Sequence, residues 1–181
     1  MKFNKMVILA LLAIFVVAIA GTASAFEIPF IGDVGGDDTQ SEPQDITVGG
    51  IDFQIPGGYE VNENYTVEND TQSTGGEYTV STAGYEDSTK ENAIFIMVGD
   101  YGEYNMTMDI LDAMADSIDG KAKTINGHDG YLSVKTAEES DDADSLVPMD
   151  YDTYMFTYVQ DGDLVIVATT NESVISEVIV E

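Results

Sequence analysis

Residues 151–169 read YDTYMFTYVQDGDLVIVAT and contain the clearest structural signal in the sequence. Two runs rich in aromatic and β-branched residues, 151–159 and 164–169, flank the polar stretch 160–163. Asp-Gly, which stands at 161–162, is typical of the type I′ turn that joins neighbouring antiparallel strands, because such a turn needs residues that tolerate a positive φ. The stretch therefore predicts a β-hairpin and, with it, an antiparallel sheet.

Further strands are expected on the N-terminal side of this hairpin. Residues 93–98, AIFIMV, are apolar throughout, which predicts a central strand buried on both faces. The other runs are shorter and more polar, and residues 51–55 show the plain alternation of a half-buried strand. Residues 127–130 are expected to be a turn, and the polar stretch 62–76 is expected to be a loop. The strands predicted here cover 51–55, 78–82, 93–98, 122–126 and 131–136.

One amphipathic helix is predicted between residues 107 and 120. Thr107 suits its N-cap and Gly120 its C-terminal stop. Two lysines just past the end, Lys121 and Lys123, are expected to offset the charge of Asp119 against the helix dipole. The apolar side chains share one helical face and aspartates occupy the other. The apolar set is Ile110, Leu111, Met114, Ala115 and Ile118, and the acidic set is Asp109, Asp112, Asp116 and Asp119.

A second, short helix is expected at residues 174–179, where Val174, Ile175, Val178 and Ile179 have helical spacing despite their β-branched side chains. The order of elements is thus strands, a helix, more strands and a final helix, with connections of hairpin size. This order predicts an α+β fold with a mainly antiparallel sheet and both helices packed on it, as a sandwich. A doubly wound nucleotide-binding fold is not expected.

The first 25 residues have the order of a secretory signal peptide. A short positive end, Met1-Lys2-Phe3-Asn4-Lys5, precedes the apolar run 6–20 and the small-residue site Ala23-Ser24-Ala25. We expect cleavage after Ala25, a flexible acidic linker over 26–45 and a single folded domain over 46–181. The alternative is an uncleaved N-terminal membrane anchor, although about 20 apolar residues are needed to cross a bilayer. Either way the protein is expected to be secreted or to act at the exterior of the cell envelope.

The charge is strongly acidic. The 181 residues include 34 Asp and Glu against 6 lysines and no arginine, for a net charge of −28. Two lysines precede the cleavage site and every acidic residue follows it, so the mature chain would carry 4 − 34 = −30. Nucleic-acid binding is excluded, because phosphate contacts depend on clustered Lys and Arg. The same charge repels an anionic membrane surface.

The stretch Gly50-Ile51-Asp52-Phe53-Gln54-Ile55-Pro56-Gly57-Gly58-Tyr59 resembles the opening of PsbP-like domains, in which a first strand ends in a Pro/Gly-Tyr or Pro/Gly-Trp turn. The later apolar strand, the amphipathic helix, the turn at 125–127 and the closing hairpin and helix also resemble that pattern. The chain is further similar to small, exported, acidic proteins of unknown function that are common in methanogenic archaea. The resemblance covers roughly 46–181 and implies a non-catalytic accessory or binding role. It carries no active-site residue onto this chain.

The residue composition gives little support for a catalytic site or a zinc site. His128 is the one histidine and would be the obvious general base, but its place between two glycines predicts an exposed turn residue. The chain has no cysteine, so a zinc site lacks ligands and no cysteine nucleophile exists. We expect no catalytic residue. A small carboxylate-based hydrolase stays an alternative, since many acidic pairs are present.

Calcium is the metal that suits this composition, because it prefers hard oxygen ligands. The weak candidates form the densest acidic groups in the chain, Asp141, Asp142, Asp144, Asp150 and Asp152. They do not fit the EF-hand pattern, so a solvated acidic loop is the simpler interpretation. No other cofactor is expected.

Four Asn-x-Ser/Thr sequons are candidates for N-glycosylation in an exported chain, and they lie at Asn64, Asn69, Asn105 and Asn171. Asn64 and Asn69 fall in the predicted loop and are favoured for that reason.

The sequence predicts an exported, non-enzymatic binding or accessory domain with an unknown envelope or extracellular partner. A calcium-dependent adhesion or stabilisation module is the first alternative.

Overall fold

The computed structural model describes residues 42–63, 66–72, 78–89, 91–136 and 152–180. The predicted signal peptide lies outside these ranges, as does the predicted linker up to residue 41. The strands are β1 (Gln44–Val48), β2 (Ile51–Ile55), β3 (Tyr59–Val61), β4 (Val67–Gln72), β5 (Tyr78–Asp87), β6 (Ala93–Asp100), β7 (Lys121–Ile125), β8 (His128–Lys135), β9 (Thr153–Gln160) and β10 (Asp163–Thr169). The helices are α2 (Met108–Met114), the 3₁₀-helix η3 (Ala115–Ile118) and α3 (Glu172–Val178).

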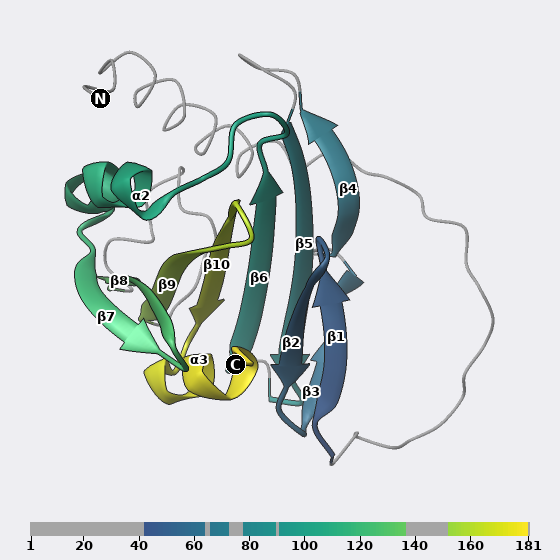
Figure 1. Cartoon of the computed structure of the whole chain (residues 1–181). Helices are drawn as coiled ribbons and strands as arrows, with labels where there is room; N and C mark the ends of the chain where they lie inside the picture. Colours follow the sequence, from purple (N-terminus) through teal and green to yellow (C-terminus); the bar gives the residue numbers. More distant parts are fainter. Residues whose placement is uncertain (1–41, 64–65, 73–77, 90, 137–151, 181) are drawn as a thin grey trace.

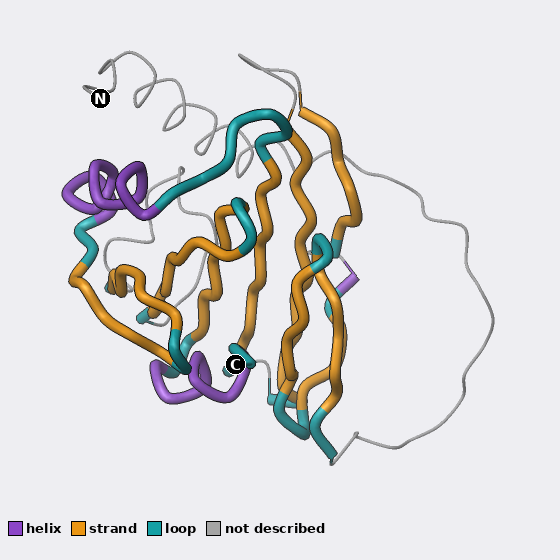
Figure 2. Tube along the Cα trace, in the orientation of Figure 1, coloured by secondary structure: helices purple, strands orange, loops and turns teal. Residues whose placement is uncertain are grey.

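Within the described ranges, all the strand pairs are antiparallel, and they form two sheets. The large sheet has the order β3-β5-β6-β10-β9-β8-β7, with β4 also paired to β5, and β1 and β2 form a separate hairpin. In Figure 1 that hairpin lies over the β5 side of the large sheet, while β7 forms the opposite edge. Figure 2 shows how small the helical part is beside the strands. The predicted α+β class with a mainly antiparallel sheet is therefore confirmed.

The two faces of the large sheet have different cores. One face packs against the β1–β2 hairpin and α3, through residues such as Phe53, Ile96 and Ile175, which are at most 1% exposed. The other face packs against α2 through Leu111, with Leu164 beneath it. Strands β6 and β10 contribute alternate side chains to both cores, which explains why their sequences are apolar throughout.

The hairpin predicted at 160–163 is confirmed. Gln160 and Asp163 close the β9–β10 pair, and the two residues between them have φ values of 54° and 95°. Such angles are those of a type I′ turn. The β7–β8 turn is of the same kind but lies at Asn126-Gly127, with φ values of 46° and 84°. The prediction of a turn across 127–130 was therefore wrong, because β8 already begins at His128.

The prediction of a loop over 62–76 was wrong in part. Residues 67–72 form β4, which pairs with β5 across a register shift between Val67 and Asp70. A strand at the edge of a sheet is held by backbone hydrogen bonds to its one neighbour and does not need an apolar sequence, so this polar segment can form a strand. β1 begins at Gln44, two residues before the expected start of the folded domain.

The helix predicted from 107 to 120 is shorter and less regular than expected. α2 begins after Thr107, whose side chain makes no capping hydrogen bond, and gives way to the 3₁₀-helix η3 at Ala115. Asp119, with φ 50°, takes the left-handed position at the end, where Gly120 was expected. The predicted C-terminal helix is confirmed as α3, with Val174, Ile175 and Val178 buried.

A substitution at Gly130 tests how closely β8 packs against β9. A Cβ atom at Gly130 would collide with the backbone oxygen of Thr157 and come within 2.9 Å of the Phe156 and Tyr158 side chains. We expect Gly130→Ala to lower the free energy of unfolding by about 3 kcal/mol, because a backbone oxygen cannot move aside as a side chain can. Chemical denaturation measures the change.

Gly99→Ala is the matched control, since the nearest atom to its Cβ would belong to Tyr101, at an ordinary 3.5 Å. We expect the control to change stability by less than about 1 kcal/mol. Equal effects of the two substitutions would contradict the packing described for β8.

Candidate functional site

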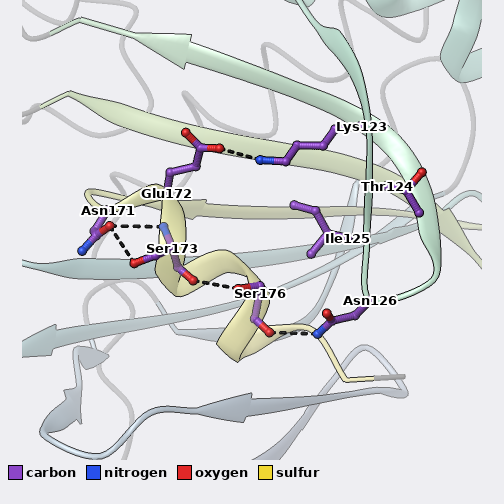
Figure 3. Close-up of a pocket in the computed structure, with 8 residues that line it drawn as sticks. All are labelled: Lys123, Thr124, Ile125, Asn126, Asn171, Glu172, Ser173 and Ser176. Atoms are coloured by element: carbon purple, nitrogen blue, oxygen red, sulfur yellow. Dashed lines mark hydrogen bonds and ion pairs between the residues drawn. The ribbon is translucent and has the colours of Figure 1, made fainter.

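A groove of about 610 Å³ lies between the edge strand β7 and helix α3. Figure 3 shows its two walls facing each other across open space. Most of the lining side chains carry hydrogen-bonding groups, so the groove suits a polar ligand or a peptide backbone. The residues that line it are Lys123, Thr124, Ile125 and Asn126 from β7 and its turn, and Asn171, Glu172, Ser173 and Ser176 from α3 and its N-cap.

The floor of the groove is fixed by the β7–β8 turn and the C-terminal segment. The Asn126 side chain donates hydrogen bonds to the backbone oxygens of Ser176, at 2.8 Å, and Ile179, at 2.6 Å. Both acceptors lie at the end of α3, where carbonyl groups lack partners within the helix. Asn126 also suits the left-handed φ that the turn requires, since Asn tolerates that region better than most residues. One side chain therefore shapes the turn and holds the helix end.

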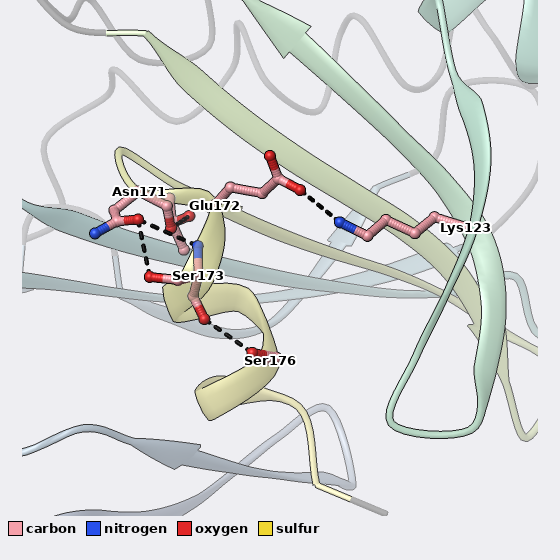
Figure 4. A network of polar contacts seen from close by, with 6 residues as sticks. Lys123, Asn171, Glu172, Ser173 and Ser176 are labelled. Atoms are coloured by element: carbon pink, nitrogen blue, oxygen red, sulfur yellow. Dashed lines mark hydrogen bonds and ion pairs between the residues drawn. The ribbon is translucent and has the colours of Figure 1, made fainter.

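An ion pair crosses the groove. The Lys123 Nζ atom lies 2.5 Å from Glu172 Oε1, and both side chains are more than a third exposed. Figure 4 shows the two side chains reaching toward each other from β7 and α3. An exposed pair of this kind contributes less than about 1 kcal/mol, so a ligand can replace it at little cost. Lys123 therefore acts on α3, and not on Asp119 as the sequence suggested.

The N-terminal end of α3 is capped by Asn171. Its Oδ1 atom accepts hydrogen bonds from the backbone N–H of Ser173, at 3.2 Å, and from the Ser173 hydroxyl, at 2.9 Å. This is the usual way in which an Asn side chain satisfies a free N–H at the start of a helix. Capping sets the direction of α3 and thereby the position of Glu172 and Ser176 along the groove.

His128 does not occupy an exposed turn, contrary to the prediction. It is the first residue of β8, and its Nε2 atom lies 3.1 Å from the backbone oxygen of Val180. Its ring packs against Tyr158, with 4.8 Å between the ring centroids. Tyr158 is buried, and that burial raises the pKa of its phenol. His128 thus fastens the C-terminal segment to the sheet, which is a structural role.

A second hollow, of about 400 Å³, lies beside β1 and is lined by backbone and hydroxyl groups with Tyr85. It contains no carboxylate, and the β7–α3 groove contains only that of Glu172. Neither space therefore holds the two facing carboxylates that a glycosidase-type mechanism requires.

Of the five calcium candidates, only Asp152 is among the described residues. Asp141, Asp142, Asp144 and Asp150 lie outside the described residues, and Asp152 is exposed beside the start of β9. Within the described ranges, no three His, Cys, Asp or Glu side chains are grouped so that they could hold a metal ion. The calcium site stays a prediction.

The glycosylation candidates fall in different settings. Asn64 lies outside the described residues, and Asn69 lies in β4, not in the loop that was expected. Asn105 and Asn171 are exposed. Asn171 uses its oxygen for capping, so its amide nitrogen, to which an N-glycan would attach, takes no part in those two bonds.

The two hydrogen bonds from the Asn126 side chain to the end of α3 should contribute measurably to stability. We expect Asn126→Gly to lower the free energy of unfolding by about 2 kcal/mol, because glycine keeps the backbone conformation while both hydrogen bonds to the helix end are lost. Urea denaturation followed by circular dichroism measures the effect.

Asp161→Gly is the matched control, since Asp161 holds the same left-handed position in the other type I′ turn. We expect it to change stability by less than about 0.5 kcal/mol. A loss as large as that of Asn126→Gly would mean that the turn backbone, and not the bonds to α3, is responsible.

No helix in the described part of the chain is long and apolar enough to cross a bilayer. No protein-family model matches the sequence, no curated protein matches it, and no solved structure matches the fold.

Proposed function

We propose that this protein is an exported, non-enzymatic binding or accessory domain that acts at the exterior of the cell envelope, and that the β7–α3 groove is its binding surface. The proposal of export rests on the N-terminal pattern of charge, apolar run and small residues. An uncleaved segment would keep the same domain at the membrane. The observation that supports binding is the groove itself, which has hydrogen-bonding groups on most of its lining side chains and lies beside β7, the last strand of the large sheet among the described residues.

The edge of β7 supplies the second part of the binding surface. β7 pairs with β8 and is the last strand of the large sheet. Ile125 and His128 close the two-residue turn, so the antiparallel pattern directs the backbone N–H and C=O groups of Ala122 and Thr124 away from β8. An extended segment of a partner can pair with those groups and continue the sheet.

The charge of β7 favours a different protein over a second copy. Lys121 and Lys123 project from the same face of the strand, because side chains alternate along it. Two copies paired through β7 would bring these lysines together, and like charges opposite one another destabilise a strand pair. A partner strand with acidic side chains avoids that repulsion and attracts the two lysines, so the edge is selective.

The same residues argue against catalysis in the groove. The Glu172 carboxylate is paired with Lys123, and the His128 ring faces the backbone of the C-terminal segment. Until a ligand displaces Lys123, the Glu172 Oε1 atom is engaged in the ion pair, and the His128 Nε2 atom faces the Val180 oxygen, so neither of these two atoms acts as a general base in this arrangement. We propose the PsbP-like sandwich as the finer description of the fold, supported by the hairpin and α3 on one face of the sheet and α2 on the other.

Site-specific photo-crosslinking in the native cell tests this surface. We expect a photoreactive residue in place of Thr124 to give one discrete adduct, because Thr124 is exposed and borders both the groove and the strand edge. Lys123→Glu in the same chain should abolish the adduct, since it places a carboxylate opposite Glu172 and closes the edge to acidic partners.

A photoreactive residue in place of Glu60, which is exposed on β3 at the other side of the sheet, is the control. The same adducts from both positions, or an adduct that survives Lys123→Glu, would contradict the assignment of this surface. Cells that yield no adduct at all from Thr124 would argue against a protein partner at the groove.

The calcium-dependent alternative has its own test. A thermal melt of the full chain in calcium should match a melt in magnesium and a melt in sodium chloride of equal ionic strength, because screening alone relieves the repulsion of a chain at −28. A calcium-specific rise in Tm that a chelator reverses would favour the calcium module over the proposal made here.

A further inference from the structure

Asn126 and Gly127 form the only Asn-Gly pair in the sequence. In such a pair the backbone nitrogen of the second residue can attack the side-chain carbonyl carbon of the first and close a five-membered ring, because glycine has no side chain in the way. Both residues are exposed at the tip of the β7–β8 hairpin. A Cβ atom at Gly127 would meet no atom within 4 Å, so the space beside its backbone is open. The pair therefore has the sequence and the access to water that spontaneous deamidation requires.

The reaction uses the chain and water alone. The Gly127 nitrogen loses its proton and forms a bond to Asn126 Cγ, the Cγ–Nδ2 bond breaks, and ammonia leaves with that proton. Water then opens the cyclic imide at one of its two carbonyl groups. The product is an aspartate or a β-linked isoaspartate at position 126, in which a negative carboxylate replaces the neutral amide. Nothing is oxidised or reduced.

The native contacts of Asn126 oppose this reaction. Its Nδ2 atom, which is the leaving group, donates to the Ser176 oxygen at 2.8 Å and to the Ile179 oxygen at 2.6 Å, and Figure 3 shows the first of these bonds. Ring closure requires a rotation that brings Cγ onto the Gly127 nitrogen, and that rotation pulls Nδ2 away from both acceptors. Asn126 therefore reacts from the state in which the end of α3 has moved away.

The product reverses the sign of the contact. The two acceptors are backbone oxygens at the C-terminal end of α3, where the helix dipole is negative. A carboxylate accepts and cannot donate, so two hydrogen bonds are replaced by repulsion between oxygens. The last turn of α3 has no basic residue and contains Glu177, so the helix supplies no compensating positive charge. The contact of His128 with Val180 and the burial of Ile179 remain, so the C-terminal segment is loosened and not released.

We propose that Asn126 is a deamidation site that the fold keeps unreactive, and that its conversion irreversibly detaches the β7–β8 turn from the end of α3. The two bonds that fix the floor of the groove also protect the amide. Local opening at α3 thus exposes Asn126 to a reaction that makes reclosing unfavourable. This chemistry needs no partner, so it is independent of the binding proposed for the groove. Where the groove does bind a partner, conversion removes one fixed side of that surface.

Peptide mapping by mass spectrometry follows the conversion of the full chain during incubation at neutral pH. We expect the folded chain to convert about 30-fold more slowly than the same chain unfolded in guanidinium chloride, which is the factor that two hydrogen bonds of ordinary strength supply. Asn105 is the internal control, because it is exposed but precedes Met106, and it should stay unconverted in the folded chain. Equal rates at Asn126 in the two states, or no conversion in the unfolded chain, would overturn the proposal.

Two matched substitutions separate local opening from global unfolding. Val178→Ala should raise the rate in the folded chain about 10-fold, because it removes part of a fully buried side chain that holds α3 in place. Val80→Ala makes the same change in the core on the other face of the sheet and should alter the rate less than about 3-fold. Equal acceleration by the two substitutions would overturn the role assigned to α3.

Asn126→Asp tests the effect of the product directly. Its urea midpoint should lie below that of Asn126→Gly, because both variants lose the two hydrogen bonds and only the carboxylate repels the end of α3. Asp161 already holds the equivalent left-handed position in the β9–β10 turn, so the turn backbone itself accepts an aspartate. A midpoint equal to or above that of Asn126→Gly would show that the product does not repel α3, and the proposed detachment would be wrong.

Discussion

The antiparallel pairing of β6 with β10 is the interaction on which the rest of the fold depends. These two strands lie in the middle of the large sheet, and each is covered on both faces. A strand in that position must be apolar on both sides, and the two opposite cores then require two separate covers. The β1–β2 hairpin and α3 cover one face, and α2 covers part of the other. Within these two strands the charged residues are confined to the ends, at Asp100 of β6 and Asp163 of β10.

The sequence predicted the elements whose signals are local. The Asp-Gly turn, the apolar run of β6 and the helical spacing of α3 each depend on neighbouring residues, and each was confirmed. β4 could not be predicted in this way, because its polar residues become a strand only through pairing with β5. The early start of β8 has a similar cause. His128 pairs with Ile125 because Asn126 and Gly127 already complete the turn.

The candidate site was less accessible to prediction because its walls come from distant parts of the chain. Lys123 and Glu172 are 49 residues apart, and Asn126 reaches backbone atoms that are 50 and 53 residues away. Nothing in the local pattern of either segment indicates that they meet. One signal was available, the Asn-Gly dipeptide at 126–127, which is typical of a type I′ turn and would have placed the turn correctly.

The bridge between Phe53 and Ile179 has a consequence for the order of events when the chain is made. It joins β2, near the start of the domain, to the residue after α3, and both side chains are buried in one core. The ribosome releases residue 53 long before residue 179, so this core cannot close while synthesis is under way. Long-range closure of this kind favours a domain whose core stays open until residue 179 has been made. That is the state in which a polypeptide can be threaded across a membrane, so a late-closing core is compatible with the proposed export of this chain.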